Sequence, residues 1–305
     1  MIFIFIYFYL ITLSKSSNNY VVGNIINVKT FSDTPSVSNI VNGKKALKNE
    51  FPFMAQLYYL NDNGSPKIKC GGSLLGDRFI LTAKHCLRYG LESYKVVVGH
   101  TTIISEQNQH KLYSIDEKFS FSAEKVRYLD MVILKLSESV PESEAKSAKI
   151  FSRHIRERMS MEVAGFGDTQ FKGNHSEILL KTKVHLSTNP KCLIYNENWK
   201  KDNNGTVFCV EPKSDTSSCN GDSGGPVVAR YRNMNYLVGV VNSGININDK
   251  KDDKNYNSSC GKDTLQYYVR VGYFLDRILD ITQIPINKLT GFDSSKHIKN
   301  TLLSK

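Results

Sequence analysis

Short extended segments dominate the chain from residue 40 onward, and they constrain its fold more than any other feature. Apolar or alternating runs are separated by polar connections that contain glycine or asparagine: RFILTA (78–83), YKVVVG (94–99), DMVILKL (130–136), MEVAGFG (161–167), ILLKTKVHL (178–186), YLVGVV (236–241) and QYYVRV (266–271). Such runs predict an all-β sandwich or barrel rather than a parallel α/β sheet. Only VGYFLDRILDI (271–281) has helical spacing, so one C-terminal helix is expected.

The two ends of the chain differ from this central region. Residues 2–13 are almost wholly apolar and are followed by small polar residues. This run is too short to span a bilayer comfortably, so we predict a secretory signal peptide over 1–17 rather than a membrane anchor. Residues 18–39 are polar, lack cysteine and periodicity, and are predicted to be a removable propeptide. The tail 282–305 is basic and polar, and we expect it to bury little.

The net charge says little about partners. The formal charge is +11, but the lysines are spread along the chain. No arginine-rich helix or zinc-finger spacing accompanies them, which disfavours nucleic-acid binding. A solvated basic surface that attracts acidic partners or anionic cell surfaces is the simpler interpretation.

Cysteines and glycosylation sequons fit an exported protein. The cysteine number is even and no C-x-x-C spacing occurs, which favours disulfides over a metal or redox site, although the sequence alone leaves their pairing open. The cysteines are Cys70, Cys86, Cys192, Cys209, Cys219 and Cys260. Sequons occur at Asn63, Asn174, Asn204 and Asn257, either as glycan acceptors or by chance in an asparagine-rich chain.

Separated motifs carry the residues of a serine-based mechanism. LTAKHC (81–86) places His85 after a strand, and Asp130 heads an apolar run, where its carboxylate would be buried if that run is a core strand. GDSGGPVV (221–228) places Ser223 in a glycine-rich turn that enters another strand. A histidine can take the serine proton, an aspartate can orient that histidine, and glycines free backbone N–H groups for an oxyanion. Each residue alone has an ordinary structural interpretation, but together they predict acyl transfer.

The chain resembles the trypsin/chymotrypsin-type serine proteases over about residues 40–281. The resemblance is carried by LTAKHC, DMVILKL and further motifs: IVNG (40–43), CGGSLL (70–75), GFG (165–167) and CNGDSGGPVV (219–228). It implies two antiparallel six-stranded β-barrels, at about 40–150 and 151–281, with the active site between them. His85 and Asp130 would come from the first barrel and Ser223 from the second. The implied disulfides are Cys70–Cys86, Cys192–Cys209 and Cys219–Cys260.

The resemblance also implies an inactive precursor. Cleavage after Asn39 would free the amino group of Ile40, which would become buried against Asp222. That ion pair would shape the oxyanion hole formed by the N–H groups of Gly221 and Ser223. Because Asn39 is neither arginine nor lysine, a trypsin-like activating protease is not expected.

Substrate preference is implied by positions aligned with the family's pocket. Ser217, at the expected pocket base, leaves it neutral, which disfavours cleavage after lysine or arginine unless another acid such as Asp215 reaches the pocket. The wall segment reads Asn242-Ser243-Gly244 in place of Ser-Trp-Gly. Gln266 stands where a glycine is usual and would narrow the pocket if it projects inward. An apolar, aromatic or small side chain is therefore expected before the cleaved bond.

The resulting prediction is a secreted, extracellular serine endopeptidase that uses no metal or cofactor. Its partners would be protein or peptide substrates, an activating protease and protease inhibitors, with no nucleic acid and no membrane span. One alternative is an inactive homologue that acts as a binding or regulatory protein, although the chain keeps His85, Asp130 and Ser223. Another is a basic secreted binding protein whose tail is the active part.

Overall fold

A computed structural model describes residues 43–121, 129–170, 173–199, 201–211, 216–248, 260–261 and 263–291. The predicted signal peptide and propeptide lie outside these residues, together with Ile40, Asp215 and Asn257.

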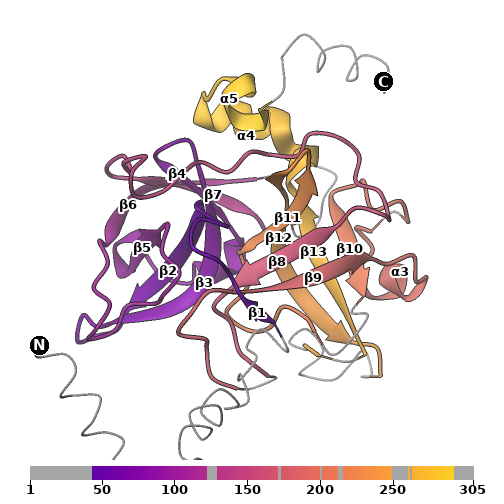
Figure 1. Ribbon diagram of the computed structural model, residues 1–305, viewed down its shortest axis with the longest axis horizontal. Coiled ribbons are helices and arrows are strands. Elements are labelled where there is room, and N and C mark those ends of the chain that lie inside the picture. Colours follow the sequence, from indigo (N-terminus) through magenta and orange to yellow (C-terminus); the bar gives the residue numbers. More distant parts are fainter. Residues whose placement is uncertain are drawn as a thin grey trace, which may run out of the picture. The chain divides into compact units, whose positions relative to one another are not determined.

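The first half of the chain forms a closed antiparallel barrel with strand order β2-β3-β4-β7-β6-β5 (Figure 1). β5 closes the ring because it pairs with both β2 and β6. The strands are β2 (Met54–Leu60), β3 (Pro66–Leu75), β4 (Phe79–Thr82), β5 (Tyr94–Val98), β6 (Tyr113–Ser120) and β7 (Val132–Leu136). β7 is buried at every position except Lys135, as expected for an apolar run that packs on both faces.

The second half forms another antiparallel barrel, in the order β9-β10-β13-β12-β11-β8, which pairing between β8 and β9 closes. Its strands are β8 (Met161–Gly165), β9 (Leu180–Leu186), β10 (Val207–Glu211), β11 (Pro226–Tyr231), β12 (Met234–Asn246) and β13 (Thr264–Arg270). A short strand, β1 (Lys44–Lys45), pairs antiparallel with the beginning of β9. The all-β fold with two six-stranded barrels is confirmed, and each run predicted as a strand overlaps one.

The helices are short. They comprise α3 (Lys191–Tyr195), α4 (Leu275–Thr282) and α5 (Ile286–Thr290), with 3-10 turns η2 (Lys84–Cys86), η3 (Leu91–Ser93) and η4 (Val271–Phe274). η4 and α4 confirm the predicted C-terminal helix. No helix in the described part of the chain is long and apolar enough to cross a membrane.

The prediction that the tail buries little is wrong for its first part. Leu289 of α5 is fully buried in the same core as the first barrel, and its carbonyl accepts a hydrogen bond from the N–H of Ile150 at 2.8 Å. Upstream of the tail, Phe274 of η4 packs edge-on against Phe121, with ring centroids 5.7 Å apart. A single turn such as α5 offers too few residues for a periodic pattern, so its burial was not visible in the sequence.

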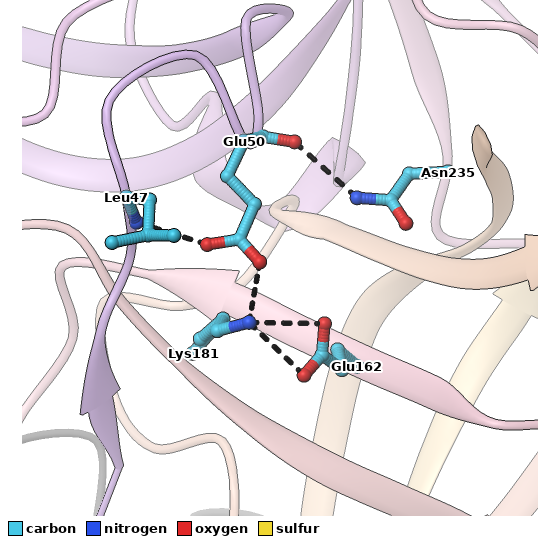
Figure 2. Close-up of polar contacts among 5 residues, drawn as sticks. All are labelled: Leu47, Glu50, Glu162, Lys181 and Asn235. Atoms are coloured by element: carbon cyan, nitrogen blue, oxygen red, sulfur yellow. Dashed lines mark hydrogen bonds and ion pairs between the residues drawn. The ribbon is translucent and has the colours of Figure 1, made fainter. Parts of the chain in front are cut away.

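A polar network ties the segment that precedes β2 to the second barrel (Figure 2). Lys181 of β9 forms ion pairs with Glu50 and Glu162, and Glu50 also accepts a hydrogen bond from the N–H of Leu47 at 2.9 Å. Asn235 donates to the carbonyl of Glu50 at 3.3 Å. Burial alone would lower the pKa of Lys181, but the hydrogen bonds and charges of both glutamates raise it. The network therefore favours the charged lysine and fixes residues 47–50.

The structure contains the disulfides Cys70–Cys86, Cys192–Cys209 and Cys219–Cys260, which use all six cysteines. These are the pairs that the resemblance implies. Each closes a loop and restricts the unfolded chain, a constraint that typically contributes about 2–4 kcal/mol.

Candidate active site

Strand pairing in the first barrel brings His85 and Asp130 together. β4 ends at Thr82, which pairs with Val132 at the start of β7, so the residues just beyond these strand ends meet. Asp130 Oδ2 lies 2.5 Å from His85 Nδ1, and Asp130 Oδ1 accepts a hydrogen bond from the backbone N–H of His85 at 2.8 Å. The 3-10 turn that carries His85 is fixed by the disulfide between Cys86 and Cys70.

The exposure of this pair differs from the expectation of a buried carboxylate. Asp130 precedes β7 rather than lying within it, and 19% of its side-chain surface remains exposed. The side chain of His85 is 41% exposed. The imidazole is therefore held on one side by a partly shielded carboxylate and is open on another.

Ser223 lies in the serine turn, residues 219–225, which leads into β11. The turn is closed by hydrogen bonds from the N–H of Asp222 to the carbonyl of Cys219 (3.1 Å) and from Gly225 to Asp222 (2.9 Å). Gly221 adopts φ +90°, a conformation that favours glycine. The N–H of Gly71 in β3 donates to the carbonyl of Ser223 at 2.8 Å, so the serine turn also contacts the first barrel.

Gly224 allows this close contact between the barrels. A Cβ atom at Gly224, where φ is +78°, would lie 2.2 Å from Thr82 Oγ1 and 2.5 Å from the carbonyl oxygen of Gly71. No larger side chain fits there without movement of the backbone.

A cleft of about 880 Å³ is lined by residues of both barrels. His85 and Asp130 line it from the first barrel, and Gly221, Ser223 and Asn242 line it from the second. The structure thus brings the three residues predicted for catalysis onto one surface.

Asp222 belongs to the serine turn, and its side chain is fully buried. Its carboxylate oxygens accept hydrogen bonds from the N–H groups of Gly167 and Cys219, each at 2.8 Å. Burial raises the pKa of Asp222 to about 7, with a further increase from the charge of Asp168, although the backbone hydrogen bonds oppose this shift. Among the described residues, no lysine, arginine or histidine forms an ion pair with Asp222.

Three of the positions expected in the substrate pocket do not line the cleft. Ser217 is buried, and its hydroxyl accepts a hydrogen bond from the N–H of Gly261 at 2.6 Å. Gly244 pairs with Gln266 between β12 and β13, and neither residue reaches the cleft surface.

The side chain of Gln266 is fully engaged by its neighbours. Its Nε2 donates to the carbonyl of Ser218 at 2.6 Å. Its Oε1 accepts hydrogen bonds from the hydroxyl of Tyr268 at 2.6 Å and from the Oγ and N–H of Ser218 at 3.0 and 3.2 Å. The amide therefore fills the space between β13 and the segment that begins at Ser217.

Sequence reasoning did not identify the other residues of the cleft rim. They come from β3, from loops and from α3, and include Lys69, Arg88, Tyr89, Ile194, Glu197 and Asn198. Nothing in their local sequence pattern indicates a shared surface, because only the packing of the two barrels brings them together.

Within the described residues, one cluster has metal-ligand spacing, namely Cys70, His85 and Cys86. Both sulfur atoms belong to a disulfide, so they offer no thiolate for a metal ion.

Comparison with known proteins identifies the family. The sequence matches the trypsin family over residues 40–276. The chain belongs to the trypsin family of serine proteases. It is 32% identical to "Venom serine protease" of Polistes dominula over 231 residues, which cover 72% of this chain and 80% of that protein. It is 31% identical to "Venom serine protease Bi-VSP" of Bombus ignitus and 26% identical to "CLIP domain-containing serine protease B4" of Anopheles gambiae. These two matches cover 68% and 67% of this chain and 62% of each relative.

The buried carboxylate of Asp222 makes the stability of the described fold depend on pH. Its pKa of about 7 in the folded state exceeds the ordinary value of 3.8, so the folded state binds this proton more tightly than the unfolded state. The resulting stabilisation is complete below pH 3.8 and is lost as the pH rises through about 7. Because each pKa unit corresponds to about 1.4 kcal/mol, we expect Asp222→Asn to gain roughly 2.5 kcal/mol relative to the wild type between pH 5 and 7.5.

Urea unfolding of both proteins at the two pH values measures this difference. Asp276→Asn, which changes an exposed aspartate of α4, is the control and should follow the wild type. Parallel loss of stability in the wild type and Asp222→Asn would contradict a raised pKa of the Asp222 carboxyl group.

Proposed function

We propose that the protein is a secreted serine endopeptidase that is made as an inactive precursor. The observation that supports it best is the close His85–Asp130 pair on the same cleft surface as Ser223. Family membership supports the same chemistry, because these proteins are serine proteases.

In the proposed reaction, Ser223 Oγ attacks the carbonyl carbon of a peptide bond. Because Nδ1 of His85 faces Asp130, Nε2 is the ring nitrogen that accepts the serine proton. His85 then donates this proton to the leaving amine as the C–N bond breaks and an ester forms on Ser223. Water, deprotonated by the same histidine, hydrolyses the ester and regenerates the serine.

The anion that develops in the tetrahedral intermediate needs backbone donors. We assign this role to the N–H groups of Gly221 and Ser223 in the serine turn. The positive φ of Gly221 supports the assignment, because it turns the backbone in a way that other residues rarely adopt.

Activation is proposed to follow cleavage after Asn39. The new amino group of Ile40 would supply the positive charge that Asp222 lacks among the described residues. A buried carboxylate next to Gly221 and Ser223 couples this ion pair to the anion site. The network around Lys181 supports the same scheme, since it holds residues 47–50 on the second barrel.

Secretion is supported by the apolar N-terminus, by the disulfides and by relatives named as venom proteases. Asn63 and Asn174 are exposed and are the better candidates for glycans. The amide of Asn204 instead bonds to both backbone polar groups of Ile155, at 2.8 and 3.1 Å. A glycan on Asn204 would disrupt this contact.

Removal of the proposed nucleophile tests the mechanism. After activation, Ser223→Ala and His85→Ala should lower peptide hydrolysis by at least about 10⁴-fold, because each removes a member of one proton-transfer unit. A fluorophosphonate probe should label the wild type but not Ser223→Ala, and circular dichroism should show that the variants remain folded. Undiminished hydrolysis in Ser223→Ala would refute the assignment, whereas an unlabelled wild type would favour an inactive regulatory homologue.

N-terminal sequencing and one substitution test the proposed activation step. N-terminal sequencing of the active form should give Ile-Val-Asn-Gly, because only a free amino group at Ile40 can pair with Asp222. Asp222→Ala should be cut at the same bond yet remain nearly inactive. Full activity in a form that still carries residues 18–39 would be incompatible with the precursor hypothesis.

Substrate preference is proposed to depend on Gln266, which the family resemblance places in the slot for the side chain before the cleaved bond, and which is buried there rather than lining the open cleft. A neutral, occupied slot leaves no partner for a buried lysine or arginine, so we expect cleavage after small uncharged residues. Gln266→Gly should open the slot and raise cleavage after phenylalanine, tyrosine or leucine by about 10- to 100-fold relative to alanine, since burial of such side chains is worth about 1.5–3 kcal/mol.

Profiling with a mixed peptide library measures the preference directly. Gln56→Ala, which changes a buried glutamine of the first barrel, is the control and should leave it unchanged. Dominant cleavage after arginine or lysine in the wild type would mean that an acid such as Asp215 binds the basic side chain of the substrate.

A further inference from the structure

The loop between β8 and β9 lies directly against the serine turn. Its neck is formed by Asp168 and His175, which make an isolated antiparallel bridge, and by a hydrogen bond from the N–H of Thr169 to the carbonyl of Asn174 at 3.1 Å. Neither Asp168 nor His175 lines the cleft, so they do not contact a substrate held there. They instead contact the peptide group between Asn220 and Gly221, shortly before Ser223.

A backbone hydrogen bond fixes the orientation of that peptide. The N–H of Asp168 donates to the carbonyl of Asn220 at 2.7 Å. This carbonyl and the N–H of Gly221 belong to the same peptide group, and in a trans peptide the two point in opposite directions. Holding the carbonyl against Asp168 therefore turns the N–H of Gly221 away from the loop.

Side chains reinforce the same contact. The amide of Asn220 donates to Asp168 Oδ2 at 3.2 Å, while Asp168 Oδ1 lies 2.7 Å from His175 Nδ1. Asp168 is nearly buried, with 8% of its side chain exposed, so its carboxylate depends on these partners. The ring of His175 covers Gly221, since a Cβ atom added to that glycine would lie 2.7 Å from His175 Cε1.

We propose that Asp168 and His175 form a positioning pair that holds the Asn220–Gly221 peptide with its N–H available to the developing oxyanion. The inference rests on the proposed function and adds two residues that act through Gly221 rather than on the substrate. The ring of His175 blocks rotation of the peptide toward the loop, and its Nδ1 lies beside the Asp168 carboxylate without forming a hydrogen bond among the described residues. Asp168 holds both the side chain and the carbonyl of Asn220.

A positioning role predicts a specific kinetic effect. In the activated protein, Asp168→Ala and His175→Ala should each lower kcat by about 10-fold and leave KM within about two-fold, because the anion site acts mainly in the transition state. Asp168→Asn keeps an oxygen acceptor for Asn220 and should recover most of the lost rate. Affinity for the C-terminal aldehyde of the best library peptide, whose hemiacetal oxygen occupies the anion site, should fall in parallel with kcat.

Rates must be expressed per active site, counted by fluorophosphonate titration, so that loss of folded protein is not mistaken for loss of rate. His100→Ala is the matched control, because this similarly exposed histidine of the first-barrel half faces Glu144 at 4.0 Å and should leave kcat unchanged. If Asp168→Ala does not fold, the more exposed His175→Ala decides the question.

Unchanged kcat per active site in His175→Ala, or in a folded Asp168→Ala, would overturn the positioning role while leaving the proposed function intact. A wild-type protein that neither reacts with fluorophosphonate nor cleaves peptides would overturn the proposed function, and this inference with it.

Discussion

The buried carboxylate of Asp222 is the interaction on which the proposed active site depends. It accepts hydrogen bonds from the backbone N–H groups of Gly167 and Cys219, and these bonds fix the backbone of the serine turn. Burial removes water from this carboxylate, and that desolvation is the main physical reason for its raised pKa. A single charge supplied at this point would offset the cost of that desolvation and stabilise the turn in one step.

The second requirement is the close approach of the two barrels. Each barrel alone carries an incomplete set of groups, and the set is completed where Gly71 donates to the carbonyl of Ser223 and Gly224 lies against Thr82. The first contact joins two backbone groups, and in the second the backbone of Gly224 lies against the Thr82 hydroxyl, so together they hold the serine turn against the first barrel. The close approach of the barrels therefore depends on glycine at positions 71 and 224.

Much of the fold and site could be predicted from the sequence because its determinants are local. Alternating runs marked the strands, and His85, Asp130 and Ser223 stand in short motifs next to strand ends. Leu289 was missed because one helical turn has no period, and its burial depends on residues far away in the chain. Asp168 and His175 were missed for a similar reason, since only loop packing places them beside Gly221. The orientation of Gln266 likewise depends on hydrogen bonds to Ser218 that no spacing rule reveals.

The C-terminal helices have a consequence for the order of folding. Phe274 and Leu289 belong to the hydrophobic core of the barrel that is synthesised first, yet they are among the last residues of the domain to be made. An emerging chain can pair β2 to β7 early, but that barrel keeps an uncovered apolar surface until α4 and α5 arrive. Contacts of such long sequence separation slow folding and lengthen the exposure of aggregation-prone surface. The core of the first barrel is therefore completed only after the segment up to α5 has been synthesised.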